Sequence, residues 1–194
     1  MKFKSQLTII LLFMSLSACS LFEKGYDNQY GQYVPKHPRF KLKDKHGNTI
    51  PQNLDTINIY REFKRYYMGE LVQPKGNDYY ASNNLVYYWK FYSNGRALGF
   101  SKFDPSNGDP TGNINDDDLN PNNANYSKSY YFSEDGKKIQ IEEFAYAEGQ
   151  GMYIILDYYL NTRGDTLTMI YKKSKTVYVR EILGENIKTY SVDW

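Results

Sequence analysis

Residue types that carry catalysis are sparse in this 194-residue sequence, which has two histidines, His37 and His46, and a single cysteine, Cys19. Both histidines lie in a polar stretch broken by glycine and proline. A Ser-His or Cys-His nucleophile needs a histidine that the fold holds rigidly. The sequence also has no HExxH, GxSxG or P-loop signature. These observations argue against nucleophilic hydrolysis, zinc-peptidase chemistry and P-loop nucleotide chemistry.

Paired carboxylates are the remaining route to acid–base catalysis, and Glu142 and Glu143 are the obvious pair. Both lie in a run of residues that predicts a β-strand, where neighbouring side chains point to opposite faces. A catalytic dyad needs both carboxyl groups on one site. We therefore interpret the pair as ordinary solvated charge and expect that the protein is not an enzyme.

The segment 104–125 (DPSNGDPTGNINDDDLNPNNAN) is rich in Asp, Asn, Gly and Pro and has no strand pattern. A loop of this length inside a compact domain is usually functional or disordered. Calcium prefers oxygen ligands, which five side chains of this loop offer: Asp109, Asn115, Asp116, Asp117 and Asp118. Their spacing differs from that of the EF-hand loop. Calcium is therefore the alternative to a plain mobile loop, and no other cofactor is expected.

The first 18 residues have the order of a secretory signal peptide, with a basic start, a short apolar middle and a small-residue end. Lys2 and Lys4 supply the charge, and Leu7–Met14 is apolar apart from Thr8. That run is too short to span a bilayer as a stable helix, which takes about 20 apolar residues. The pattern predicts that residues 1–18 are an export signal that is removed.

Leu16-Ser17-Ala18-Cys19 resembles the lipobox of bacterial lipoproteins. The resemblance implies that the Cys19 thiol receives a diacylglycerol, that cleavage occurs just before it, and that the new N-terminus is acylated. Two or three acyl chains hold a protein stably on a membrane, at about 0.8 kcal/mol per buried CH2. In this family an Asp after the cysteine signals inner-membrane retention. Ser20 stands there, which implies outer-membrane delivery in a host with two membranes.

The mature chain is expected to be electrically neutral, because loss of Lys2 and Lys4 leaves 22 basic and 22 acidic residues. Such a balance gives no reason to expect nucleic acid as a partner. With Cys19 lipidated, no thiol remains for a disulfide or a metal. Residues 19–53 are predicted to be the lipidated cysteine and a polar tether broken by Gly and Pro, and residues 54–194 the folded domain.

From residue 54 onward the pattern is that of β-strands. The strongest signal is Leu85–Tyr92 (LVYYWKFY), which ends at the tight-turn sequence Asn94-Gly95 before Arg96–Phe103 returns. Further strands are predicted at Thr56–Glu62, Lys128–Phe132, Lys138–Tyr146, Met152–Leu160, Thr166–Tyr171, Thr176–Ile182 and Ile187–Val192. Residues 62–69 and 118–125 allow one or two turns of helix. The prediction is an all-β antiparallel meander of about 8–10 strands, closed as a barrel or packed as a sandwich.

Two segments resemble the small lipocalin-like domains of bacterial lipoproteins: Trp89–Gly95 (WKFYSNG) and Gly151–Met169 (GMYIILDYYLNTRGDTLTM). The resemblance covers about half of the mature chain and implies a lipocalin-like barrel. The chain lacks the Gly-x-Trp near the first strand that marks lipocalins proper.

Tyrosine is the unusual component, with 21 residues and five Tyr-Tyr pairs. In a strand, each pair places one ring on either face. The rings are interpreted either as sheet packing with polar rims or as a platform for a ligand or glycan. Tyr87, Trp89 and Phe91 share one face of their strand and Tyr88 and Tyr92 the other. These five residues are the candidate ligand site, with the alternative that Trp89 is simply core.

The function predicted from these patterns is that of a non-catalytic, membrane-anchored envelope lipoprotein that binds a small apolar or glycan ligand. The first alternative is a structural or protein-interaction lipoprotein of an envelope assembly, whose outward tyrosines meet another chain. The second alternative is an enzyme. Aromatic-lined barrel mouths are common ligand sites, which favours the first interpretation.

Overall fold

The computed structural model describes residues 25–27, 33–36, 38–45, 50–72, 85–103, 114–120, 127–147, 150–187, 190 and 192. The predicted signal peptide, Cys19, both histidines and Asp109 lie outside the described residues. The regular secondary structure of the described chain is β-strand except for one short helix, α2 (Asp116–Leu119). The predicted all-β fold class is confirmed.

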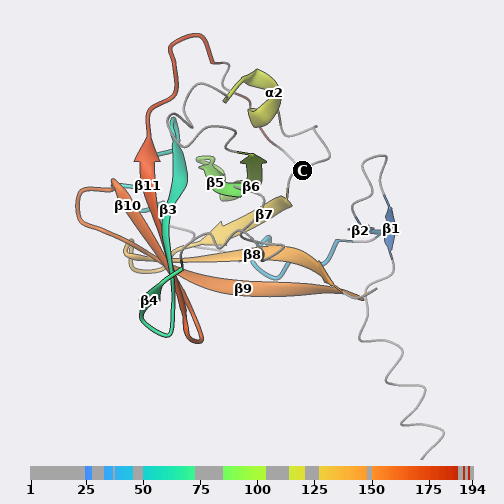
Figure 1. The fold of residues 1–194 in the computed structure, drawn as a ribbon. Coiled ribbons are helices and arrows are strands. Elements are labelled where there is room, and N and C mark those ends of the chain that lie inside the picture. The colour runs from blue at the N-terminus through green and yellow to red at the C-terminus, as the bar shows by residue number, and fades with distance from the viewer. Residues whose placement is uncertain are drawn as a thin grey trace, which may run out of the picture.

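Eight strands form a closed antiparallel barrel (Figure 1). They are β3 (Ile59–Tyr67), β5 (Leu85–Phe91), β6 (Arg96–Phe103), β7 (Ser127–Phe132), β8 (Lys138–Ala147), β9 (Gln150–Leu160), β10 (Thr166–Tyr171) and β11 (Ser174–Glu181). Each strand pairs with the next along the chain, and β11 pairs with β3 to close the circle. Closure removes the unpaired edges that an open sheet would expose. The predicted meander is thus a lipocalin-like barrel and not a sandwich.

Three short elements lie beside the barrel. The strand β4 (Glu70–Leu71) forms a hairpin with the far end of β3. The strands β1 (Gly25–Asp27) and β2 (Tyr33–Pro35) pair with each other in a separate two-stranded sheet. The predicted helical turn at 62–69 is therefore a strand and hairpin. The turn predicted at 118–125 overlaps α2 only at residues 118 and 119, and residues 121–125 lie outside the described residues.

One half of the barrel interior is filled by large apolar side chains from alternating strand positions. Leu160 faces Leu167, which in turn faces Tyr178 on the next strand. Phe91 lies between Tyr60 and Tyr131, with ring centroids 5.6 and 5.3 Å away in edge-to-face geometry. All of these side chains are less than 10% exposed. The packing leaves this half of the barrel solid.

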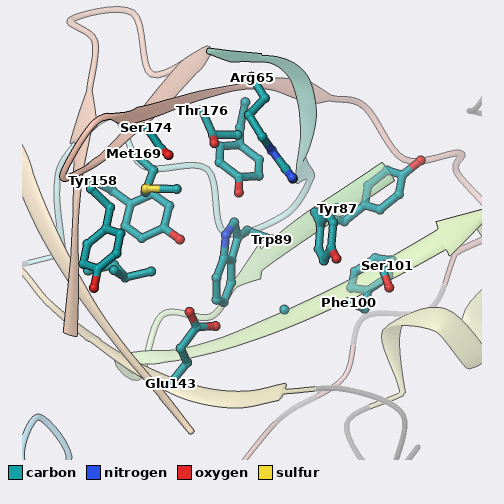
Figure 2. A pocket seen from close by; sticks show the side chains of 15 residues that line it. Arg65, Tyr87, Trp89, Phe100, Ser101, Glu143, Tyr158, Met169, Ser174 and Thr176 are labelled. Carbon is teal, nitrogen blue, oxygen red and sulfur yellow. The ribbon is translucent and has the colours of Figure 1, made fainter. Parts of the chain in front are cut away.

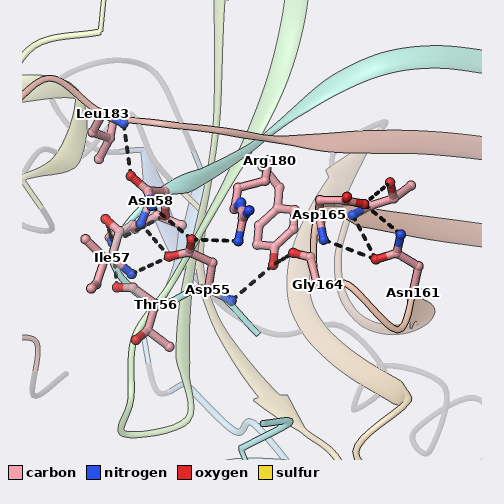
Figure 3. Close-up of polar contacts among 12 residues, drawn as sticks. Asp55, Thr56, Ile57, Asn58, Asn161, Gly164, Asp165, Arg180 and Leu183 are labelled. Carbon is pink, nitrogen blue, oxygen red and sulfur yellow. Dashed lines mark hydrogen bonds and ion pairs between the residues drawn. The ribbon is translucent and has the colours of Figure 1, made fainter. Parts of the chain in front are cut away.

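The chain entering β3 seals this end through polar contacts with the turn between β9 and β10 (Figure 3). The Tyr60 hydroxyl donates to the carbonyl of Gly164 at 2.8 Å and accepts from the backbone N–H of Asp55 at 3.1 Å. Gly164 has a φ of +71°, and a Cβ there would lie 1.9 Å from the carbonyl oxygen of Asn53. The turn can approach so closely because residue 164 has no side chain.

The N-terminal segment covers part of the outer surface. Phe40 and Leu42 are buried against Tyr130 and Phe132 of β7. The Leu42 N–H donates to the Glu142 carboxylate at 2.7 Å. Residues 19–53 were expected to be a tether, but Phe40 and Leu42 pack on the outer face of the barrel and so are part of the folded domain.

The C-terminal segment covers a second part of the outer surface. Leu183, Ile187 and Tyr190 pack with Leu119 of α2 over a cluster on β3, β5 and β6 that contains Ile59, Tyr88 and Phe100. Asn94 donates to the carbonyl of Val192. The described residues of the predicted last strand, Ile187–Val192, are not in a strand, so this prediction was wrong. The pairing of β11 with β3 leaves no free edge for another strand.

Candidate functional site

The other half of the barrel contains a cavity of about 450 Å³ (Figure 2). Small-molecule sites in proteins commonly span about 300–1,000 Å³. The wall combines aromatic, polar and charged side chains, among them Tyr87, Trp89, Glu143, Tyr158, Met169 and Tyr178. Four wall residues are substantially exposed and mark the mouth: Arg65, Tyr87, Ser101 and Tyr171. The barrel is thus solid at one end and hollow at the other.

Trp89 lies where the solid half meets the cavity. Its ring packs edge-on to Tyr158, with centroids 5.9 Å apart. The indole N–H hydrogen-bonds with the hydroxyl groups of Tyr158 and Tyr178, which also bond to each other. Burial raises the pKa of both phenols, so both remain neutral at ordinary pH.

Gly99, directly across the sheet from Trp89, makes room for this ring. A Cβ at position 99 would lie 2.9 Å from the indole, which is closer than van der Waals contact permits. The large side chain of Trp89 and the lack of a side chain at Gly99 are therefore complementary, and together they fix the floor of the cavity.

Glu143 projects into the cavity from β8, with its carboxylate directed toward Trp89 (Figure 2). Desolvation by the surrounding wall raises its pKa to about 7. It has no hydrogen bond or ion pair with any described residue. A carboxyl group of this kind exchanges a proton near neutral pH.

Glu142, the neighbour of Glu143, points to the outside of the barrel and is fully buried beneath Leu42. The two carboxyl groups lie on opposite faces of β8, as the strand pattern predicted. The interpretation as solvated charge was wrong for Glu142, which the N-terminal segment covers. It was also wrong for Glu143, because barrel closure places that residue inside.

Arg65 enters the cavity because β3 contains a β-bulge. Glu62 pairs with Tyr178 and Lys64 with Val177, so Phe63 between them has no partner across the strand. The extra residue shifts the alternation, and Arg65 rather than Lys64 faces inward opposite Thr176. The Arg65 guanidinium forms an ion pair with Glu62 at 2.8 Å. It also lies over the Tyr87 ring, 5.5 Å from the centroid.

The five aromatic residues proposed from the sequence lie in three places. Tyr87 and Trp89 line the cavity, and Trp89 is at the same time core, with 5% exposure. Phe91 faces inward but is fully buried in the solid half. Tyr88 borders the cavity, but its ring stacks on Phe100 on the outer side, with centroids 5.1 Å apart. Tyr92 packs outside against Leu98 and Val192.

Sequence reasoning missed Arg65, Glu143, Tyr158, Met169 and Tyr178 as cavity residues. The signal for Tyr158 was present in its pair with Tyr159, since one ring of each Tyr-Tyr pair was expected inside. Tyr158 is 2% exposed and Tyr159 is 42% exposed. No comparable signal marked Arg65, because a bulge has no signature in the residue pattern of β3.

The aspartate-rich segment supplies a capped helical turn. Asn115 is the N-cap of α2: its side chain accepts from the Asp118 N–H, and the Asp118 carboxylate accepts from the Asn115 N–H. Lys102 forms an ion pair with the same carboxylate at 2.5 Å. Asp116 and Asp117 lie in the first turn of α2, where negative side chains interact favourably with the helix dipole. Among the described residues, no three acidic, histidine or cysteine side chains are grouped to hold a metal.

No helix in the described part of the chain is long and apolar enough to cross a bilayer. No protein-family model matches this sequence, and comparisons with curated proteins and with solved structures give no significant match. The function is therefore argued from the barrel and its cavity.

Proposed function

We propose that this protein is a lipid-anchored lipoprotein of the bacterial envelope whose barrel binds a small ligand in its hollow half. The observation that carries the proposal is the cavity of about 450 Å³, which has a solid floor and a mouth bordered by Tyr87 and Tyr171. A barrel used only as a scaffold gains stability from a filled interior, because packed side chains contribute more than empty space. An unfilled, partly polar half therefore favours a binding role.

The proposed role is non-catalytic. Glu142 and Glu143 project to opposite sides of β8 and cannot act on the same atom. The wall instead offers side chains that hold a ligand: aromatic rings, tyrosine hydroxyls, a guanidinium and a carboxyl group. Sites of this composition orient and desolvate small molecules.

Ligand binding is tested by native mass spectrometry of the full-length protein purified in mild detergent. We expect the wild-type protein to show an added mass from a non-covalently bound ligand. Ser101→Trp, on the cavity wall, should lose that mass, because the indole would fill the space. Thr162→Trp, on the exposed turn at the solid end, should keep it. Absence of any bound mass, or equal retention in both variants, would contradict the proposal.

Anchoring rests on the sequence Leu16-Ser17-Ala18-Cys19, with delivery to the outer membrane suggested by Ser20. Cys19→Ala should move the protein from the membrane fraction to the soluble fraction and abolish incorporation of labelled fatty acid. Cys19→Ser is the matched control that keeps size and polarity but cannot form the thioether. If either variant still incorporates fatty acid, the lipobox interpretation is wrong.

A second candidate function is docking of a partner protein at the mouth. Tyr67 and Met68 at the tip of the β3–β4 hairpin, and Tyr171 beside the β10–β11 turn, are 47–64% exposed. A hydrogen bond of 2.9 Å from the Met68 N–H to the Lys173 carbonyl holds the two tips together. Grouped exposed apolar side chains commonly mark interaction sites. Tyr67→Ser with Met68→Ser should abolish partner capture and spare the bound mass if this function is correct.

A further inference from the structure

The charges of the cavity wall are unevenly paired. Arg65 is held by Glu62 at 2.8 Å and lies over the Tyr87 ring. Glu143 is on the opposite part of the wall (Figure 2) and has no ion pair or hydrogen bond with a described residue. The cation of the cavity therefore already has an anionic partner, whereas the anion does not have a cationic one.

The neighbours of Glu143 cannot neutralise it. The groups that face it are Trp89 from β5, Tyr158 from β9 and Tyr178 from β11, with Glu62 and Arg65 of β3 beyond them. The indole and the two phenols carry no positive charge, and the phenol hydroxyls are already hydrogen-bonded among themselves and to Trp89. The Glu143 carboxyl group consequently faces open cavity and the edges and faces of aromatic rings.

As a deepening of the ligand-binding function proposed above, we propose that the ligand carries an organic cation, an amine or quaternary ammonium group, bound between Glu143 and the rings of Trp89 and Tyr158. Aromatic faces are electrically negative and attract cations, most strongly for tryptophan and where water is excluded. A carboxylate beside such rings adds a full negative charge in surroundings of lowered dielectric constant.

Other ligand classes fit these groups less well. An anionic ligand would be repelled by the ionised Glu143 carboxylate. The cation that could bind such a ligand, Arg65, already forms an ion pair with Glu62. A purely apolar ligand would displace water from Glu143 without supplying hydrogen bonds in its place. A buried polar group that lacks hydrogen bonds is energetically unfavourable. A cation satisfies the carboxylate and the aromatic rings together.

The test compares choline with its neutral carbon isostere, 3,3-dimethylbutan-1-ol, by calorimetry on the full-length protein at pH 8. The two probes have the same shape and hydroxyl group and differ in charge. We expect choline to bind at least about tenfold more tightly, as cation–π attraction and one ion pair together predict. Glu143→Gln should reduce this ratio to near one, while Glu134→Gln, on the exposed β7–β8 turn, should leave it unchanged.

The pH dependence provides a second readout. Because the pKa of Glu143 is about 7, choline affinity should rise between pH 6 and pH 8 in the wild type and remain constant in Glu143→Gln. Equal binding of the two probes, or no binding of choline together with an uncharged or anionic co-purifying mass, would overturn the cation inference and leave ligand binding intact. A protein with no co-purifying mass would instead refute the ligand-binding function itself.

Discussion

Replacing Glu143 with glutamine should stabilise the protein, and the effect should depend on pH. The pKa of this carboxyl rises from 4.5 to about 7 on folding because the barrel wall desolvates it. The folded state therefore binds more protons than the unfolded state between these values. Stability contributed by the protonated form is present below pH 4.5 and is lost as the pH rises through 7.

The magnitude follows from the size of the shift. Each pKa unit corresponds to about 1.4 kcal/mol, so ionisation of Glu143 destabilises the folded protein by ~3 kcal/mol at pH 8 and by less than ~1 kcal/mol at pH 5. The glutamine of Glu143→Gln has a similar shape and cannot ionise. The variant should exceed the wild type in free energy of unfolding by roughly these amounts.

The assay is urea unfolding at pH 5 and pH 8, followed by intrinsic fluorescence. Glu134→Gln is the matched control, since Glu134 is exposed and lies outside the cavity. A gain for Glu143→Gln that is the same at both pH values would show that the effect is not ionisation. A loss at pH 8 would show that Glu143 is favourably paired in the folded protein, which would refute the reasoning.

Three further substitutions test the packing that shapes the barrel. Gly99→Ala should cost about 1–3 kcal/mol and shift the fluorescence of Trp89, because its Cβ would meet the indole at 2.9 Å, whereas Gly184→Ala, with open space around it, should change neither. Gly164→Ala should destabilise by more than about 3 kcal/mol in thermal unfolding, owing to positive φ and contact with the Asn53 carbonyl, and a loss under 1 kcal/mol would contradict the described turn. Tyr60→Phe removes two hydrogen bonds at the solid end and should cost about 1–3 kcal/mol in urea unfolding, and an unchanged midpoint would show that these bonds do not seal the barrel.

The sequence predicted most of the barrel strands well because runs rich in aromatic and β-branched residues are bounded by turn sequences. Leu85–Tyr92 and its return strand match β5 and β6 within one residue. The turns at Asn94-Gly95 and Gly164 have positive φ at glycine, which is the property that marks turns in a sequence. Local chemistry was therefore sufficient for the order of these strands, but not for residues 62–69, which are not helical, or for the described residues of 187–192, which are not in a strand.

The cavity was harder to predict because it depends on contacts between distant segments. No residue pattern near Glu143 indicates that strands distant from it in the sequence enclose its side chain. The same holds for Tyr88 and Tyr130, whose rings lie on the outer face of the barrel. They are 2% and 3% exposed because the C-terminal and N-terminal segments cover them.

The docking of Phe40 and Leu42 on β7 also sets how far the domain can stand from its proposed anchor. A tether extending to residue 53 would allow the barrel to move much farther from the lipid than a tether that ends at residue 40. Between Cys19 and Phe40 a fully extended chain reaches no more than about 75 Å. The β1–β2 hairpin folds back within this stretch and shortens it further. A lipidated Cys19 would thus hold the attachment point of the barrel at Phe40 within about 75 Å of the membrane, so the barrel would collect its ligand near that surface.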